Sequence, residues 1–294
     1  MSGTALLQAV VDGILTGGVY ALMAAGLTLI FGVMDIINIA QGIMVILGAY
    51  LSFELSVHLG IGLLPGLLIT VPFMFLVGVA IEFCFIRRLR DQDRTQMSIL
   101  VTYAVAIIIE GILTAIYGVN YVQLSASYVN SSVHVFGFYL ADIYLIGFGM
   151  AVALLACLYY MLYRTKFGRA IRASLQNRTA ADLIGVNVNR VRTISVGIGV
   201  GVTAVGGVVF GATNAFNPNT GYDLISRLLA IVILGGMGSL AGAMAAAVFL
   251  LVINDVVAVW WSPTWAPLVY FVALVIVLSI RPQGLLGRTA VRAQ

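Results

Sequence analysis

Long apolar runs separated by short polar segments dominate the chain. Seven stretches of more than 20 residues contain no Asp, Glu, Lys or Arg, and each is long enough for a bilayer-spanning helix of about 20 residues. They are 13–34, 55–81, 111–141, 143–163, 193–222, 228–254 and 256–280. The alternating pattern of a transmembrane β-barrel strand is missing. We therefore predict an all-α, polytopic transmembrane helix bundle of about eight spans, folded as a single domain over 1–294.

Basic residues are confined to a few polar segments, and their distribution predicts the orientation. Four arginines share the loop at 87–94, seven of the fifteen Lys and Arg residues lie within 164–192, and three more follow position 280. Cytoplasmic loops carry an excess of Lys and Arg. We therefore expect these regions and the C-terminus in the cytoplasm, and the segment 120–140, which has no Lys or Arg, on the outer side.

The apolar region after the second basic segment predicts a discontinuous helix. A span that starts there ends outside, yet the chain must return before its C-terminal arginines, so an odd number of further crossings is needed. Three apolar pieces follow, and the first, 228–237, is short and runs into Gly235, Gly236 and Gly238. Broken helices at membrane depth lie in the protein core or line a cavity. We expect this one beside the substrate pathway.

Two segments share one pattern of residues. Both 34–52, MDIINIAQGIMVILGAYLS, and 231–248, IVILGGMGSLAGAMAAAV, have an apolar lead, a break of small residues and a continuation rich in Gly and Ala. Duplicated transporter folds contain such repeats and place the substrate route where the repeats meet. The pattern therefore predicts an internal repeat.

A few polar residues interrupt the apolar runs. Asp35, Asn38 and Gln41 recur every three residues, so on a helix they would form one polar stripe. Such a stripe either lines the substrate pathway or hydrogen-bonds a neighbouring helix. Glu110 lies within a span, where a lone charge is expensive. It is a further pathway candidate, or else a buried carboxyl that is protonated or paired with Arg227.

Composition agrees with a membrane protein and excludes other classes. The 294 residues are 62% hydrophobic and 9% charged, with a mean hydropathy of +1.09, far beyond the apolar share of a soluble domain. The net charge of +4 comes from basic residues at span ends, so we expect no nucleic-acid partner. His58 and His134, the only histidines, are 76 residues apart and have no Cys or acidic pair at metal-ligand spacing around either, so we expect no metal site.

The sequence contains no recognisable nucleotide-binding or catalytic motif. Lys166 is the only lysine, and it follows Thr165 rather than the glycine of a GxxxxGK[ST] loop. The serines lack the GxSxG context of a nucleophile. We therefore predict a transport subunit without catalytic residues or cofactors, whose ATP hydrolysis, if transport uses it, belongs to another chain.

The hydrophilic segment 164–192 has the pattern of two short elements. In the first, Phe167, Ile171 and Leu175 share one face of a basic amphipathic helix, a pattern that also suits attachment to an anionic membrane surface. In the second, Thr179 pairs with Asp182 as a capping box. The residues that this second element would expose as an apolar knob are Ala180, Ala181, Leu183 and Ile184, ended by Gly185 as a C-cap. A separate knob favours docking to a partner over membrane attachment.

Several motifs resemble those of a known family. TAADLIG, at 179–185, is similar to the EAA-xxx-G cytoplasmic loop of ABC importer permeases, with Thr179 in place of Glu and without the downstream Leu-Pro. FGRAIRASLQN, INIAQGIMVILGAY and VILGGMGSLAGA resemble the branched-chain amino acid permease family, in particular its shorter, high-affinity-type subunit. The likeness extends over most of the chain.

This resemblance implies an importer in which two permease subunits, usually different, form the pore in the inner membrane of a bacterial-type cell. A pair of cytoplasmic ATPases would drive it, and an external binding protein would deliver branched-chain or related amino acids. The implied coupling helix comprises Thr179, Ala180, Ala181, Asp182, Leu183 and Gly185. Relatives that carry urea, short amides or sugars leave other substrates open, and an ion-coupled secondary transporter that uses Glu110 is the alternative from another class.

Overall fold

Helices account for almost all of the secondary structure in the computed structural model, which describes residues 3–89, 94–126, 129, 131–135, 138–281 and 283–286. In chain order the elements are α1 (Gly3–Met34), α2 (Gln41–Leu59), α3 (Leu63–Cys84), the 3-10 helix η1 (Ile86–Arg88), α4 (Arg94–Tyr117), β1 (Ser132–Val135), β2 (Phe138–Ala141), α5 (Asp142–Arg164), α6 (Lys166–Gln176), α7 (Arg178–Leu183), α8 (Val188–Thr213), α9 (Thr220–Gly235), α10 (Leu240–Trp260) and α11 (Leu268–Ile280). Seven helices of the described chain are long and apolar enough to cross a membrane, and α9 and α11 are shorter. The predicted polytopic helix bundle is confirmed.

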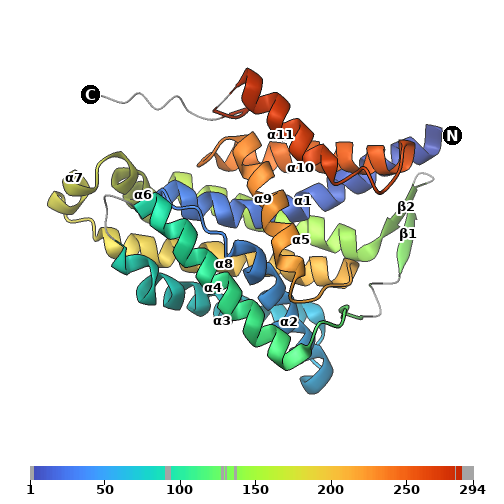
Figure 1. Cartoon of the computed structure of the whole chain (residues 1–294), viewed down its shortest axis with the longest axis horizontal. Helices are drawn as coiled ribbons and strands as arrows, with labels where there is room; N and C mark the ends of the chain where they lie inside the picture. The colour runs from blue at the N-terminus through green and yellow to red at the C-terminus, as the bar shows by residue number, and fades with distance from the viewer. Residues whose placement is uncertain are drawn as a thin grey trace.

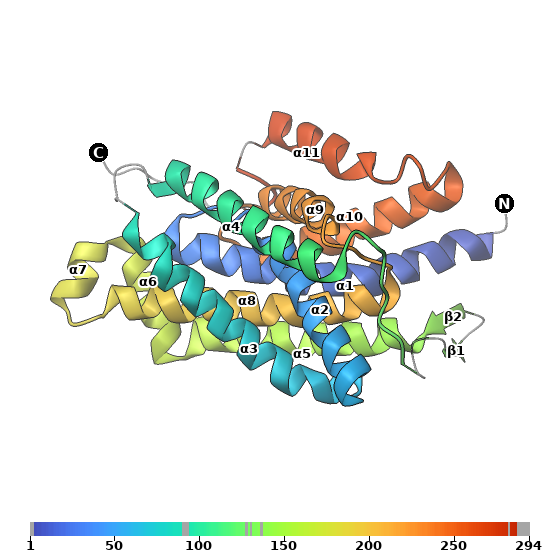
Figure 2. The ribbon, with the colours of Figure 1, turned by 60° about the horizontal axis from the view of Figure 1, so that its bottom comes forward.

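The two ends of the bundle differ in character (Figure 1). α6 and α7 protrude at one end, and we call this the basic end. The β1–β2 hairpin and the N-terminus lie at the opposite end, the hairpin end, and the turned view in Figure 2 shows the same division. The positive-inside rule requires such a separation of the basic segment 164–192 from the hairpin segment.

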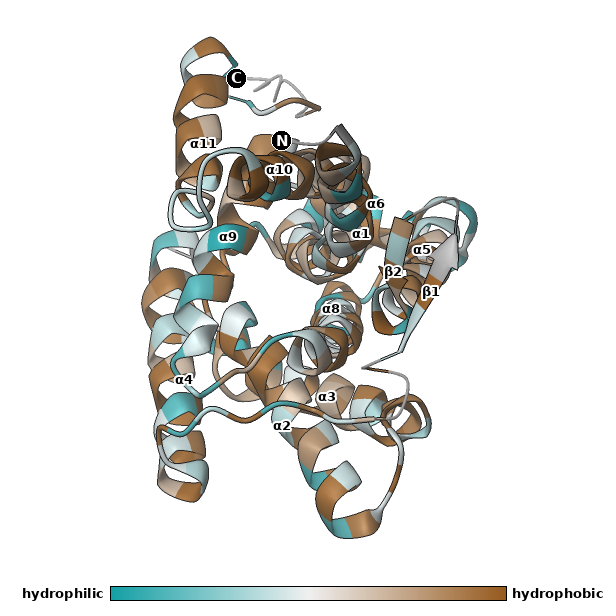
Figure 3. Ribbon diagram, turned by 90° about the vertical axis from the view of Figure 1, so that its right-hand side faces the viewer, coloured by the Kyte–Doolittle hydropathy of each residue, from teal (hydrophilic) through white to brown (hydrophobic). Residues whose placement is uncertain are grey.

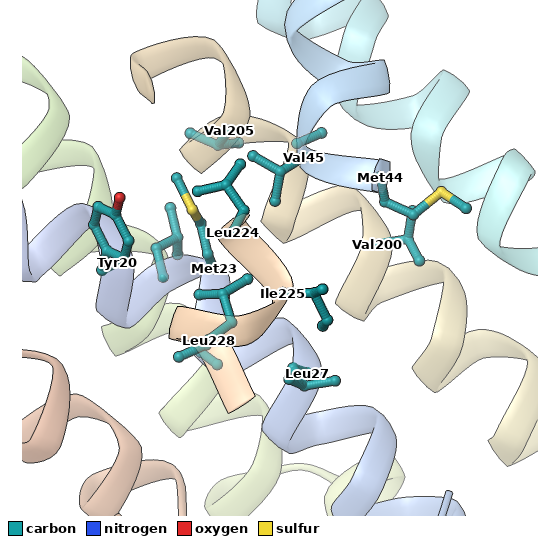
Figure 4. Packing of buried hydrophobic residues seen from close by; sticks show 14 of the residues in the cluster. Tyr20, Met23, Leu27, Met44, Val45, Val200, Val205, Leu224, Ile225 and Leu228 are labelled. Atoms are coloured by element: carbon teal, nitrogen blue, oxygen red, sulfur yellow. The ribbon is translucent and has the colours of Figure 1, made fainter. Parts of the chain in front are cut away.

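α1 and α8 form the centre of the bundle. The most apolar windows of α1 and α8 are each 83% buried, whereas those of α4 and α5 are 22% buried. α1 packs along α8 and α10, and α2 and α3 pack along α8. Figure 4 shows how Leu224, Ile225 and Leu228 of α9 join buried side chains of α1, α2 and α8 in one cluster. The outer helices therefore present much of their surface to lipid or to another subunit.

Small residues bring α1 and α10 into close contact. A Cβ atom at Gly13 would lie 2.6 Å from the Val252 Cα atom, and one at Gly17 would lie 2.8 Å from the Val248 Cα atom. Apolar lipid tails provide no hydrophobic driving force between helices, so van der Waals packing of this kind holds a membrane bundle together.

β1 and β2 form a short β-hairpin, which the hydrophobic pattern did not predict. β1 and β2 are antiparallel, with Ser132 opposite Ala141. The Gln8 side chain in α1 donates to the Tyr139 carbonyl oxygen at 2.7 Å and accepts from the Tyr139 amide at 3.1 Å. Strands of four residues are too short to show a clear alternation. This Gln8–Tyr139 clasp holds the hairpin against the start of α1.

Candidate functional site

The segment 164–192 folds into the two short helices that its pattern predicted, α6 and α7. α6 is the basic amphipathic helix, and its Ile171 side chain is buried. Arg172 donates a hydrogen bond to the Leu162 carbonyl oxygen of α5, and its guanidinium carbon lies 5.6 Å from the centre of the Tyr163 ring. These contacts fix α6 to the end of α5 independently of any membrane surface.

The N-terminal end of α7 differs from the prediction. The Asn177 side chain accepts a hydrogen bond from the Ala180 amide at 3.0 Å and is therefore the N-cap. The predicted capping box of Thr179 and Asp182 is wrong, because the helix already begins at Arg178. Asn is as good an N-cap as Ser or Asp, since its carbonyl oxygen satisfies one of the free amides of the first turn.

The C-terminal end of α7 agrees with the prediction for Gly185. Its φ angle is 86°, in the left-handed region that favours glycine. The Gly185 amide donates to the Asp182 carbonyl oxygen, and the Val186 amide donates to the Ala181 carbonyl oxygen, both at 3.0 Å. These bonds satisfy carbonyl groups that the end of a helix would otherwise leave free.

Burial divides the predicted apolar knob into two parts. Leu183 is 84% exposed and Ile184 is 75% exposed, and Ala180 is also exposed, whereas Ala181 is only 2% exposed. The predicted exposure of Ala181 is wrong, because a helix of six residues that packs on α6 and α8 must turn one side inward. Leu183 and Ile184 therefore provide the apolar surface that is available for docking.

One hydrogen bond joins α7 to the end of α1. The Arg178 guanidinium donates from Nη2 to the Met34 carbonyl oxygen at 3.4 Å. Met34 is the last residue of α1, and the chain then passes through 35–40 into α2. This hydrogen bond therefore links α7 to the start of the connection between α1 and α2.

The predicted discontinuous helix is present between α9 and α10. α9 ends at Gly235 and α10 begins at Leu240. Between them, Gly236 and Gly238 have φ angles of 96° and 82°, a conformation that is readily available only to glycine. A Cβ atom at Gly32 of α1 would lie 3.6 Å from the Gly238 Cα atom. The break therefore lies against the last part of α1.

The C-terminal segment caps the broken end of α9. The Leu285 amide donates to the Leu234 carbonyl oxygen at 2.8 Å, and the Leu286 amide donates to the Gly235 carbonyl oxygen at 3.2 Å. The last turn of a helix leaves its carbonyl groups without partners in the helix, and leaving such groups unpaired in the bilayer is expensive. The segment therefore stabilises the break.

The predicted polar stripe does not form on one helix. α1 ends at Met34, Asp35 is exposed with a φ angle of 56°, and α2 begins only at Gln41. Asn38 lies in the irregular connection and is buried. A helical stripe is therefore the wrong description, because the chain breaks where the period of three residues was counted.

Asn38 and Gln41 are linked to each other and to α8. The Asn38 side chain donates to Gln41 Oε1 at 3.0 Å, and Gln41 Nε2 donates to Thr203 Oγ1 at 2.5 Å. Gln41 is fully buried. These contacts favour interhelical packing, the second of the two interpretations. A contribution of Asn38 and Gln41 to the substrate pathway stays a prediction.

Glu110 and Arg227 do not form a pair. Glu110 accepts a hydrogen bond from the Tyr222 hydroxyl group of α9, whereas Arg227 Nη1 donates to the Tyr20 hydroxyl oxygen at 3.5 Å and its guanidinium lies over the ring of Tyr270. The predicted pair is wrong, because the two residues lie on different sides of α9. Glu110 of α4 contacts the side that carries Tyr222, whereas Arg227 contacts Tyr20 of α1 and Tyr270 of α11.

α9 also carries an exposed polar face. Tyr222, Asp223 and Ser226 are exposed, and Figure 3 shows hydrophilic residues on both α9 and α4 among mostly apolar neighbours. Polar groups in a membrane span face protein or water rather than lipid. This face therefore needs a cover other than lipid tails.

A polar cavity near the hairpin end was not predicted. Its volume is about 360 Å³, and Asp12 of α1, Arg227 of α9 and Asp255 of α10 all line it. In the sequence these residues are far apart and only limit apolar runs. One sequence signal could have identified them, because an ionisable residue within a membrane helix is a candidate functional residue.

Comparisons with known proteins agree with this architecture. LivH, the high-affinity branched-chain amino acid transport system permease protein of Escherichia coli (strain K12), is 29% identical over 97% of this chain and 96% of its own length. BraD, the protein of the same description from Pseudomonas aeruginosa, is 28% identical over 97% of both chains. LsrC, the autoinducer 2 import system permease protein of Klebsiella pneumoniae, is 37% identical over 40% of this chain and 36% of its own.

A solved structure and a family model extend the comparison. PsaBC from Streptococcus pneumoniae, solved in complex with a Fab, has a similar fold, with a TM-score of 0.51 at 10% identity over 92% of this chain and 91% of that chain. The family model described as branched-chain amino acid transport system / permease component matches residues 9–278. This chain is therefore a multi-pass membrane protein that belongs to the branched-chain amino acid transport system permease family.

Proposed function

We propose that this chain is a permease subunit of an ATP-driven ABC importer for branched-chain or related amino acids. It forms the pore with a second permease subunit of different sequence. Two cytoplasmic ATPase subunits bind at the basic end, and an external binding protein delivers the substrate to the hairpin end. The chain itself carries no catalytic residue or cofactor. It lies in the inner membrane of a bacterial-type cell, with its C-terminus in the cytoplasm.

The observation that carries this proposal is the apolar tip of α7. Leu183 and Ile184 are exposed at the basic end, outside the apolar part of the bundle. Arg178 of the same helix is bonded to the end of α1. An exposed apolar tip with a rigid connection to the core suits a coupling helix that inserts into a groove of an ATPase. Thr179, Ala180 and Asp182 form its exposed polar and small-residue flank.

The polar face of α9 supports a second permease subunit. Tyr222, Asp223 and Ser226 are exposed, and Glu110 of α4 bonds Tyr222 at the edge of this face. We place the substrate pathway between this face and the second subunit, because a partner across a water-filled path covers polar groups that lipid cannot. Two irregular connections would form the inner end of the pathway. One contains Asp35 and Asn38 and leads to Gln41 at the start of α2, and the other contains Gly236 and Gly238 and follows Gly235 at the end of α9.

The substrate class rests on the relatives. LivH and BraD are described as branched-chain amino acid permeases and match nearly the whole chain, whereas the likeness to the autoinducer 2 permease covers less than half of it. Amino acids are therefore the first substrates to test. Urea, short amides and sugars are the alternatives, and an ion-coupled secondary transporter is the alternative mechanism.

Reconstituted uptake tests the proposal. The chain is co-expressed with the permease, ATPase and binding-protein genes that neighbour it, purified as a complex and placed in proteoliposomes. We expect uptake of labelled L-leucine that requires ATP at the basic end and the binding protein at the hairpin end. Uptake by this chain alone, driven by a sodium or proton gradient, would refute the importer and establish the secondary transporter. ATP-dependent uptake of a sugar or urea, but not of leucine, would refute only the amino-acid substrate.

A further inference from the structure

The polar cavity at the hairpin end has the dimensions of a ligand site. It lies between α1, α5, α8, α9, α10 and α11, and its volume of about 360 Å³ lies within the range of small-molecule pockets, about 300–1,000 Å³. It is distinct from the exposed polar face of α9 and from the two helix breaks at the basic end. No part of the proposed coupling mechanism uses it.

One wall of the cavity is acidic. Asp12 accepts a hydrogen bond from Gln8 Nε2 at 2.9 Å, and Asp255 accepts one from Asn254 Nδ2 at 3.0 Å. The two carboxyl groups belong to helices that pack closely, α1 and α10, and both line the cavity. Two like charges in a site of low dielectric repel each other, and a cationic group placed between them relieves that repulsion.

The opposite charge comes from another helix. Arg227 of α9 lines the same cavity, and its guanidinium carbon lies 5.7 Å from the centre of the Tyr270 ring. Among the described residues of the cavity, no salt bridge joins Arg227 to Asp12 or Asp255. The basic and acidic groups therefore line one cavity without a direct ion pair between them.

The Tyr270 hydroxyl group adds an unused hydrogen-bonding group. Tyr270 is fully buried, lines the cavity, and its hydroxyl oxygen has no hydrogen-bond partner among the described residues. A buried hydroxyl without a partner is expensive, and native structures seldom retain one without a ligand or water to satisfy it. The Arg227 guanidinium lies over the Tyr270 ring, and both residues line the cavity, so one carboxylate in the cavity could accept hydrogen bonds from both.

The remaining walls and the cover complete the site. Val19, Phe210 and Leu251 give the cavity an apolar wall. Tyr139 of the hairpin also lines it, and the Gln8–Tyr139 clasp holds this strand in place. Ligand pockets combine such apolar walls with a few polar groups that fix the orientation of the ligand.

We propose that this cavity binds one free amino acid with an aliphatic side chain. Its ammonium group lies between Asp12 and Asp255, its carboxylate bonds Arg227 and the Tyr270 hydroxyl, and its side chain meets the apolar wall. The choice of an aliphatic side chain rests on the proposed function, whereas the zwitterionic class follows from the charges of the cavity itself. An amino acid bound in this cavity, at the hairpin end, would make the cavity an amino-acid sensor within the permease.

Equilibrium binding tests this site. The full-length chain is purified alone in lipid nanodiscs, and binding of tritiated L-leucine is measured without binding protein or nucleotide. We expect saturable binding that Arg227→Gln and Asp255→Asn each weaken at least tenfold. Tyr270→Phe, which keeps the ring, should weaken it about threefold, the effect of one lost hydrogen bond. Glu54→Gln, a carboxylate removed from α2 outside the cavity, is the matched control and should bind like the wild type.

Competition separates the ligand classes. Isoamylamine offers the ammonium group alone and 4-methylpentanoate the carboxylate alone, so each should compete at least tenfold less well than leucine. An amine that competes as well as leucine would overturn the zwitterion site and indicate a cation site. Absence of saturable leucine binding, or equal binding by Arg227→Gln and Glu54→Gln, would also overturn it.

Two controls are needed. The first separates a loss of leucine binding from misfolding, and the second separates failure of this site from failure of the proposed function. Arg227→Lys keeps the charge and should restore binding in part, and every variant must elute as a single species and co-purify with the ATPases. Leucine uptake by the assembled importer without binding to the isolated chain would refute this site and leave the function intact. Leucine binding to the chain without ATP-dependent leucine uptake would refute the function and leave the site.

Discussion

Removal of the Leu183 side chain tests the docking role of α7. Leu183 is 84% exposed in the isolated chain, so its side chain contributes little to the stability of the subunit itself. Leu183→Ala removes three carbon atoms, and each buried methylene group contributes about 0.8 kcal/mol. If the side chain is buried in an ATPase groove, the variant should lose about 2 kcal/mol of binding free energy. This loss corresponds to an approximately thirtyfold higher Kd.

The assay measures the affinity of purified ATPase subunits for the chain in nanodiscs. Leu175→Ala is the matched control, because Leu175 is a half-exposed leucine of α6 in the same basic segment. Docking through α7 predicts a large effect for Leu183 and an effect below threefold for Leu175. A Leu183→Ala variant with wild-type affinity would refute the docking role. Equal losses at both positions would instead show that docking is not specific to α7. Ala181 is unsuitable for this test, because its burial within the chain would confound folding with docking.

Three further predictions concern the connection from α7 to the helix breaks. Gly236→Leu should reduce ATP-dependent uptake at least tenfold without loss of assembly, because a side chain at φ 96° costs about 1–3 kcal/mol. Gly111 lies in the regular helix α4 with open space around it, so the control Gly111→Leu should transport normally. Gly185→Val should reduce ATPase stimulation by the binding protein, whereas Gly185→Asn, a residue that tolerates the left-handed region, should retain it. Arg178→Gln should leave ATPase affinity within threefold but reduce uptake, and the exposed Arg190→Gln should change neither. Uptake by Arg178→Gln at the wild-type rate would contradict coupling through the end of α1.

The features that the sequence predicted correctly are those with a local physical cause. A run of apolar residues has to be helical in lipid, because only the helix satisfies the backbone within one segment. Gly185, Gly236 and Gly238 mark positions with positive φ angles, and glycine is the residue that adopts them without strain. Both the end of α7 and the break after α9 were therefore recognisable from residue types and spacing.

The features that were missed depend on contacts between distant segments. The burial of Ala181 follows from the position of α6 and α8, and the bond of Gln41 to Thr203 joins α2 to α8. Asp12 and Asp255 come together because α1 and α10 pack along each other. A periodicity count considers one segment at a time, so it treated these carboxylates as the ends of spans rather than as parts of one site.

The basic end brings three elements of the proposed mechanism into direct contact. Arg178 of α7 bonds the last carbonyl group of α1. Gly32, near the same end of α1, lies against Gly238 in the break between α9 and α10. The C-terminal amides of Leu285 and Leu286 hold the other side of that break. In the proposed importer, a shift of α7 would reach both the α1–α2 connection and the α9–α10 break through the end of α1, without deforming the close-packed centre of the bundle. Because helices packed at van der Waals distance move as rigid units, the irregular connections at this end are where such a shift is absorbed.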